Sequence, residues 1–309
     1  VRSGNGNYDI YAQRIDADGN PQWTNDGIPV CNASKEQNSP CITSDGTGGA
    51  IIMWEDFRTN YADLYGQRIN KNGESLWTKN GVLVCGTTGA QSAPEVISDG
   101  TGGAIVTWQD FRRNYADMYA QRIDGGGTIL WEEWGVAVCN AQGHESFAVI
   151  VSNGAEGAII TWIDTRNGTN NNDIYAQQLD GNGAVQWLAD GVPICTASGN
   201  QNYPMITTDG AGGALIGWWD MRSGDFNIYA QRIDLAGYVQ WGKNGLAICI
   251  ESGIQNRVSI ISDGDNGAIL VWNDNRTAPA DFDVYAQRID RKGITLWEKN
   301  GTTISAASD

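Results

Sequence analysis

The most conspicuous charged feature of the sequence is a repeated WxDxR motif. It occurs at Trp54/Asp56/Arg58, Trp108/Asp110/Arg112, Trp162/Asp164/Arg166, Trp218/Asp220/Arg222 and Trp272/Asp274/Arg276. A carboxylate beside a guanidinium could form part of a ring of binding sites, or it could be an ion pair that fastens neighbouring segments. Catalytic residues are needed once per site, whereas a packing requirement is copied into every repeat. We therefore predict a structural role for these Asp and Arg residues, at the rim of the fold.

Two acidic turn sequences have oxygen atoms that could bind calcium. They are SDGTGG at residues 44–49 and DADGN at residues 16–20. The second turn lacks the glutamate that closes a calcium loop at its twelfth position, and the equivalent turn after Asp124 is made of glycines. The preference of Asp, Asn and Gly for tight turns explains both sequences better than calcium binding does. We expect no metal and no cofactor, with calcium as the one ion left open; a single histidine, His144, argues against zinc.

Most of the cysteines follow the repeat. Cys31, Cys85, Cys139, Cys195 and Cys249 occupy equivalent positions. Equivalent positions on different repeats should exceed the Cα separation of about 7 Å that a disulfide tolerates. We expect free thiols that act as small buried hydrophobic residues. Cys41 is additional, and Cys31 with Cys41 is the one pair that could form a bridge.

Several aromatic residues break the repeat pattern, and a shared fold does not explain such departures. They are Tyr8, Phe57, Phe111, Trp134, Trp219, Phe226 and Phe282. Exposed on a loop face, these rings could stack on sugars; the alternative is local variation in packing. A tryptophan that recurs near the end of each repeat, as at Trp77 and Trp131, is instead expected in the core between neighbouring sheets.

The elements that position these residues repeat with a period of about 54. The segment DIYAQRI at residues 9–15 recurs at 63–69, 117–123, 173–179, 227–233 and 283–289. Each complete unit contains four strand-like runs separated by glycine turns such as DGTGG, which favour antiparallel hairpins. Tandem four-stranded units without helices are typical of propeller blades. We predict an all-β, six-bladed β-propeller of four-stranded antiparallel blades, with a solenoid as the weaker alternative.

The predicted boundaries make residues 1–309 one propeller domain. Residues 1–32 supply the outer strands of a blade that is split between the termini or incomplete. Complete blades are predicted at 38–86, 92–140, 146–196, 202–250 and 256–305. The sequence leaves open whether the ring closes with five or six blades. The missing sixth WxDxR motif indicates a chain excerpted from a longer one.

The order of the motifs resembles that of sialidases and other Asp-box propellers, in which a PxIxxDG strand precedes a strand ending in an acid and Arg and then a DIxxxR strand. The turn at Asp18 and Gly19 before Trp23 lacks the Ser and Thr of an Asp-box. The likeness is therefore architectural. Tandem DxYAQRI and WxDxR units also resemble repeats of large secreted bacterial proteins, which implies a secreted or cell-surface bacterial location.

The net charge of the chain limits the classes of partner that it can bind. Its formal net charge is −16, from 36 acidic and 20 basic residues. Such a charge repels nucleic acid phosphates and anionic membrane surfaces. The longest apolar runs are too short to cross a bilayer. We expect neither nucleic acid binding nor membrane insertion.

These observations favour a non-catalytic extracellular recognition or scaffold module that binds carbohydrate or protein through loops on one face. We therefore expect no enzyme activity. The alternative is a sialidase-like glycoside hydrolase or lyase with an axial active site. A sialidase site needs singular residues, including a Tyr/Glu pair, and none stands out from the repeats. A third possibility is a spacer in a longer surface protein whose activity lies elsewhere.

Overall fold

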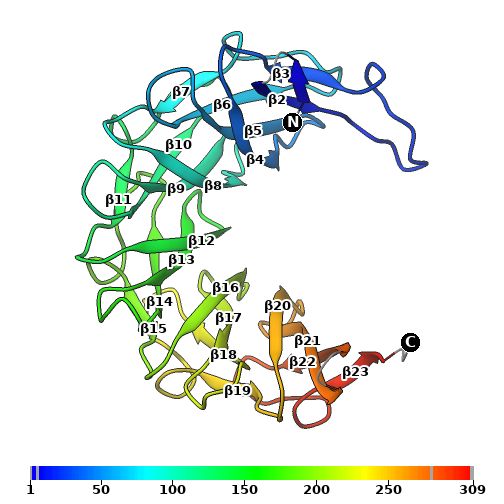
Figure 1. Cartoon of the computed structure of the whole chain (residues 1–309), viewed down its shortest axis with the longest axis vertical. Helices are drawn as coiled ribbons and strands as arrows, with labels where there is room; N and C mark the ends of the chain where they lie inside the picture. The colour runs from blue at the N-terminus through cyan, green and yellow to red at the C-terminus, as the bar shows by residue number, and fades with distance from the viewer. Residues whose placement is uncertain (1, 5–6, 279–280, 307–309) are drawn as a thin grey trace. The chain divides into compact units, whose positions relative to one another are not determined.

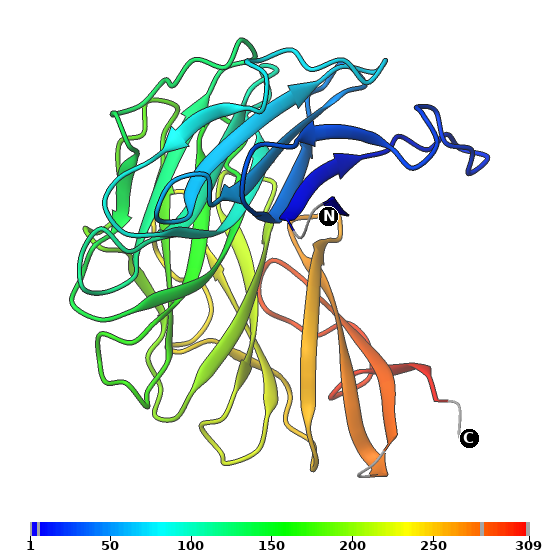
Figure 2. The same cartoon turned by 45° about the horizontal axis from the view of Figure 1, so that its top comes forward.

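The computed structural model describes residues 2–4, 7–278 and 281–306. Its regular structure consists of 23 strands, and the described residues form no helix. The strands make six antiparallel sheets, five of four strands and one of three, which Figures 1 and 2 trace along the chain. The prediction of an all-β propeller with six blades, one of them incomplete, is confirmed. No helix of the described residues is long and apolar enough to cross a membrane.

The first sheet is the incomplete one. Its order is β1-β2-β3, with β1 (Arg2–Gly4), β2 (Asn7–Ala12) and β3 (Ile28–Cys31). The sequence predicted only outer strands here, and the short β1 adds a third by pairing with β2. Residues 1, 5 and 6 of the predicted segment lie outside the described residues.

The five complete sheets share one plan, in which consecutive strands pair as antiparallel neighbours. One sheet contains β4 (Gln37–Ser44), β5 (Ala50–Asp56), β6 (Asp63–Ile69) and β7 (Val82–Cys85). The next contains β8 (Gln91–Ser98), β9 (Ala104–Asp110), β10 (Asp117–Ile123) and β11 (Val136–Cys139). The third contains β12 (Glu145–Ser152), β13 (Ala158–Asp164), β14 (Asp173–Leu179) and β15 (Val192–Cys195). The fourth contains β16 (Gln201–Thr208), β17 (Ala214–Asp220), β18 (Asn227–Ile233) and β19 (Leu246–Cys249). The last contains β20 (Gln255–Ser262), β21 (Ala268–Ala278), β22 (Asp281–Ile289) and β23 (Thr302–Ser305).

The chain divides into two compact units of three sheets each. The first unit comprises Val1–Asn140 with Gly181–Ala184, and the second comprises Ala141–Asp180 with Val185–Asp309. The turn Gly181–Ala184 belongs to the first unit because the Trp131 Nε1 and Arg122 Nη1 groups donate hydrogen bonds to the Gly181 carbonyl. The single-domain boundaries drawn from the sequence stay a prediction.

The core of each unit lies between its sheets, so the central strands are buried on both faces. All of β13 is buried, and Trp108 on β9 packs with Met53, Trp77 and Val96. The Trp77 Nε1 group donates to the Gly125 carbonyl of the adjoining sheet at 3.1 Å. The recurrent tryptophan thus joins neighbouring sheets; Trp297, in the last repeat, is 39% exposed.

Glycine and aspartate turns hold the hairpins in register. At Gly135, with a φ of 89°, an added Cβ would lie 2.5 Å from the Trp108 ring, so only glycine fits. Asp99 Oδ1 accepts hydrogen bonds from the backbone N–H groups of Thr101 and Gly103, while Arg122 pairs with Asp99 at 3.0 Å. The turn chemistry read from the sequence therefore sets the strand ends.

Candidate functional site

The WxDxR residues form bonds mainly within their own sheets. Asp110, fully buried, accepts hydrogen bonds from Trp108 Nε1 at 2.9 Å and from Arg112 Nε at 2.8 Å. Arg112 Nη2 also donates to the Trp134 carbonyl at 2.8 Å, and the guanidinium lies 3.8 Å from the centre of the Tyr119 ring. These contacts link two strands to a turn, and they occupy the carboxylate.

The motif of the third complete sheet makes the same contacts. Arg166 donates from Nε to Asp164 Oδ1 at 2.9 Å and from Nη2 to Asp164 Oδ2 at 2.6 Å. Arg166 Nη2 also donates to the Asp190 carbonyl at 2.7 Å, and its guanidinium lies 4.0 Å from the centre of the Tyr175 ring. Arg166 therefore faces its own sheet, and we do not place it in a ligand site.

These residues are more buried than a ring of open binding sites would be. The five aspartates are fully buried and the five arginine side chains are only 16–22% exposed, because each guanidinium lies between its carboxylate and a tyrosine ring. Their structural role at the rim stays a prediction, which these contacts favour. The residues are Asp56 with Arg58, Asp110 with Arg112, Asp164 with Arg166, Asp220 with Arg222, and Asp274 with Arg276.

The acids considered for calcium are turn residues in the structure. Asp45 Oδ1 accepts the backbone N–H groups of Thr47 and Gly49, both at 2.8 Å, and its Oδ2 faces Arg68. Hydrogen bonds to its turn help hold the pKa of Asp45 down at about 2, although burial opposes this. Asp16 Oδ1 accepts the N–H groups of Asp18 and Asn20. Both carboxylates therefore serve to close turns.

The cysteines are free thiols in the described structure. Five end their strands in buried positions, and Cys41 is partly buried. Burial raises the pKa of Cys85, Cys195 and Cys249 to about 12. Their thiols are therefore poor nucleophiles at neutral pH.

The seven aromatic residues singled out from the sequence are spread over five sheets. Tyr8 is on β2, Phe282 is on β22, and Phe57 and Phe111 follow β5 and β9. Trp134 lies in the turn before β11 and packs partly buried on the core. Trp219 on β17 and Phe226 before β18 belong to one sheet and meet edge to face, with ring centres 5.7 Å apart.

Trp219 and Phe226 belong to a larger group of rings in the second unit. The Tyr203 ring lies 4.4 Å from the Trp219 ring and 4.9 Å from the Phe147 ring. Phe147 and Tyr203 are 51% and 44% exposed, although their rings contact neighbouring rings in tilted pairs. We call Phe147, Tyr203, Trp219 and Phe226 the aromatic strip. The sequence reading missed Phe147 and Tyr203, although their place in the repeat is filled by Ser39 and Ala93 elsewhere.

Phe147, Tyr203 and the nearby Arg257 all occupy a bulge in the first strand of their sheets. Phe147, Tyr203 and Arg257 have φ values of 51°, 51° and 52°. Each lies at a shift in strand register, where the first strand of a sheet bulges against the second. A bulky residue in left-handed backbone is uncommon and costs of the order of 1–3 kcal/mol. Bulges re-aim side chains and are frequent beside active sites.

A cavity opens beside the aromatic strip. Its volume is about 440 Å³, and it is lined by Tyr203, Met205, Trp219, Arg257, Val258 and Ser259. These residues come from β16, β17 and β20, and β20 contacts both other strands. Trp219 Nε1 is buried and has no hydrogen-bond partner among the described residues, so the exposed part of this side chain that a ligand could meet is its ring. The cavity thus combines apolar rings, a tyrosine hydroxyl and one guanidinium.

The equivalent place in the first unit is acidic. Glu55 stands at the position of Trp219, and Cys41 and Glu95 stand at the positions of Met205 and Ser259. Glu55 Oε1 accepts the Ala93 N–H at 2.8 Å, which ties the two neighbouring sheets together. Burial raises the pKa of Glu95 above its usual value. We call Cys41, Glu55 and Glu95 the acidic corner.

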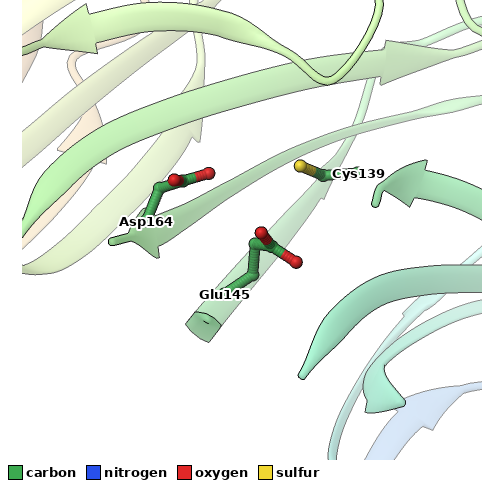
Figure 3. A group of neighbouring side chains, drawn as sticks. All are labelled: Cys139, Glu145 and Asp164. Carbon is green, nitrogen blue, oxygen red and sulfur yellow. The ribbon is translucent and has the colours of Figure 1, made fainter. Parts of the chain in front are cut away.

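One further carboxyl group departs from the repeat. Glu145 stands where the other complete sheets have Gln37, Gln91, Gln201 and Gln255. It pairs in register with Asp164, beside which Figure 3 draws it. Both residues are fully buried. Cys139, also drawn there, ends β11 of the first unit. Because no solvent reaches the two carboxyl groups, we do not place them in a reaction.

Comparison with known proteins identifies the fold. No protein-family model matches the chain, and no curated protein sequence does. An ulvan lyase, described as a new polysaccharide lyase family, PL25, has a TM-score of 0.55 and 11% identity over 83% of this chain and 68% of that one. A thermostable family-43 glycoside hydrolase has a TM-score of 0.44 and 12% identity, covering 88% of this chain and 95% of its own. An endo-arabinase from Bacteroides thetaiotaomicron has a TM-score of 0.41 and 13% identity, covering 85% and 94%.

These comparisons change one expectation from the sequence. The chain was expected to be a non-catalytic recognition or scaffold module and not an enzyme. That expectation is wrong: the polysaccharide lyase that matches with a TM-score of 0.55 points instead to the alternative, an enzyme that acts on carbohydrate. The repeats alone did not indicate this, because most of their conspicuous residues recur in every unit. At these identities the likeness establishes the fold, a β-propeller also found in carbohydrate-active enzymes.

Proposed function

We propose that the protein is a polysaccharide-degrading enzyme, secreted or held at a bacterial cell surface, whose substrate binds in the cavity beside the aromatic strip. The observation that carries the proposal is the cavity itself, where Tyr203, Trp219 and Arg257 converge. A polysaccharide is too large to enter a cell intact, which favours an extracellular location.

The lining of the cavity suits an acidic sugar. Aromatic rings such as those of Tyr203 and Trp219 can stack on the apolar faces of sugar rings. Arg257, which is exposed, can bind a carboxylate or sulfate group with two parallel hydrogen bonds. The lyase with the similar fold was solved with the fragment -[GlcA(1-4)Rha3S]-, which has both groups. We therefore propose a uronate-containing polysaccharide as the substrate.

The same groups support β-elimination. Arg257 would neutralise the uronate carboxylate and so make the proton on the adjacent C5 easier to remove. Tyr203, as its phenolate, would accept the C5 proton and then donate it from the resulting hydroxyl group to the departing oxygen. The electron pair of the C5–H bond becomes the C4–C5 double bond, the C4–O bond breaks, and the departing oxygen takes a proton. The cavity-lining residues include no carboxylate, whereas hydrolysis by the usual route needs two.

Hydrolysis is the second candidate, and the acidic corner is the observation that favours it. Glu55 and Glu95 are carboxyl groups without counterparts in the other repeats. The raised pKa of Glu95 suits a general acid, and Glu55 would be the second carboxylate. In this case the substrate would bind to the first unit.

One set of assays separates the candidates. Elimination creates an unsaturated sugar that absorbs ultraviolet light, whereas hydrolysis creates a reducing end without that absorbance. We expect ultraviolet-absorbing product from a uronate polysaccharide, formed at least a hundredfold more slowly by Tyr203→Phe and Arg257→Ala and at the parent rate by Glu55→Gln and Glu95→Gln. Reducing ends without absorbance, lost in the two glutamate variants, would instead establish hydrolysis. No product from any acidic or neutral polysaccharide would refute the proposed function.

A further inference from the structure

A second cavity lies at the other end of the same sheets. It has a volume of about 540 Å³ and is lined by Ala211, Arg232, Gln240, Asn266, Arg291 and Lys292. Ala211 and Asn266 are in the turns that connect β16 to β17 and β20 to β21. Trp219 is near the opposite end of β17, which spans about 20 Å at the usual rise per residue. The two cavities are therefore distinct sites of the second unit.

Cations line the second cavity. They are Arg232, Arg291 and Lys292. The Arg232 side chain is 17% exposed and pairs with Asp209 at 2.7 Å, whereas Arg291 and Lys292 are exposed. Carboxylates lie in the same turns, since Asp290 precedes Arg291 and Asp265 precedes Asn266. Within the described residues, however, neither Arg291 nor Lys292 forms an ion pair, so both can bind an anionic ligand.

The basic pair is a departure from the repeat. The turn after β22 reads Asp-Arg-Lys-Gly at residues 290–293, whereas the preceding repeat has Asp-Leu-Ala-Gly at 234–237. Asp290 Oδ1 accepts the Lys292 and Ile294 N–H groups at 2.9 and 2.8 Å, and Asp234 Oδ1 accepts the equivalent N–H groups. The backbone is thus held in the same way in both turns. The turn does not require the basic side chains, so they need another explanation.

We propose that this cavity binds a sulfate or carboxylate group of an acidic polysaccharide. Arg291 and Lys292 would provide the charge, and the amide groups of Gln240 and Asn266 could bond neighbouring hydroxyls. The volume falls in the usual range for small-ligand sites. The net charge of −16 disfavours a long polyanion such as a nucleic acid, because a polyanion contacts a wide surface of the protein. A single acidic group at a local basic site is repelled much less. This proposal holds whichever reaction the first cavity performs.

The test is a binding measurement in the Arg257→Ala background, so that the first cavity does not contribute its guanidinium. Calorimetry would measure binding of a sulfated uronate tetrasaccharide, a neutral tetrasaccharide of the same length, and sodium sulfate. The matched variant is Arg291→Leu/Lys292→Ala, which installs the Leu-Ala pair of the preceding turn. Because the chain already folds with that pair at 235–236, thermal unfolding should be unchanged.

We expect the acidic tetrasaccharide to bind with an affinity that falls as salt rises, and to bind about tenfold more weakly in the double variant. The neutral tetrasaccharide should not bind the site. Equal affinity in the two proteins would overturn the proposal. Sulfate binding without tetrasaccharide binding would also overturn it, because the site would then hold small anions only.

Discussion

The acidic corner of the first unit and the cavity of the second unit are built on the same backbone positions. Glu55 and Trp219 are equivalent residues near the ends of β5 and β17, and Ala93 and Arg257 are equivalent bulge residues on the next sheets. The bulge φ is 50° at Ala93 and 52° at Arg257. The fold therefore supplies one geometry, and the side chains decide whether it presents carboxylates or rings with a guanidinium. The chemical character of each place is thus set by the residues that differ between repeats.

The largest expected effect on activity comes from removing the Arg257 guanidinium, which lines the cavity beside the aromatic strip. Arg257→Ala should lower kcat/KM on a uronate polysaccharide by two to three orders of magnitude, about 3–4 kcal/mol, because the carboxylate charge that builds up in the elimination is no longer stabilised. Steady-state kinetics would measure the loss. Ala93 shows that the bulge accommodates alanine, so the variant should fold normally. Full activity in this variant would show that Arg257 does not stabilise the charge, and it would contradict the difference proposed between the two units.

The third complete sheet offers a comparison of the same kind. Glu145→Gln restores the residue of the other four sheets and removes one of two facing, fully buried carboxyl groups. We expect the variant to be more stable at neutral pH by about 2 kcal/mol, because a neutral amide is less costly to bury than a carboxylate. The difference should shrink in acid, since a protonated carboxyl group is also neutral. Denaturant unfolding at several pH values would test this, and a less stable variant at neutral pH would contradict it.

Trp219→Ala should weaken substrate binding more than it affects folding. The ring contacts Tyr203 and Phe226 but is only partly buried, so its loss should raise KM about tenfold. Its neighbour is the control. Trp218 is fully buried and donates to Asp220, so Trp218→Ala should cost about 3–5 kcal/mol of stability. An unchanged KM in the Trp219 variant would remove this residue from the site.

The smallest effect should come from the acidic corner. The Glu95 side chain is exposed as a whole, but neighbouring protein atoms partly desolvate its carboxyl group and raise its pKa, so the native state holds this proton more tightly than the unfolded chain does. The associated stability is present at low pH and is lost as the pH rises through the raised pKa. Glu95→Gln should therefore be slightly more stable than the parent at neutral pH. The gain should stay below about 0.5 kcal/mol, because the side chain is exposed and solvent screens it. Thermal unfolding compared between acidic and neutral buffer would measure it, and a variant less stable than the parent at neutral pH would contradict it.

Part of the candidate site could be predicted from residues alone. Trp219 and Phe226 break the repeat within a short segment, and the structure puts their rings in contact. Tyr8 and Phe282 break it too, but they lie on β2 and β22, on other sheets. A residue that differs from its counterparts in the other repeats is therefore a candidate site residue. Whether two such residues meet depends on which sheets pack together.

The repeat by itself determined the strands, the hairpin turns and the buried Trp–Asp–Arg contacts, because these depend on local pattern and on pairing between strands that follow one another. Only the tertiary structure decided which singular residues share a cavity. Tyr203 and Arg257 lie on first strands of neighbouring sheets, 54 positions apart in a chain whose repeat spacing is similar. Their meeting depends on a left-handed bulge residue and on packing between sheets, and neither is encoded in the period of hydrophobic residues.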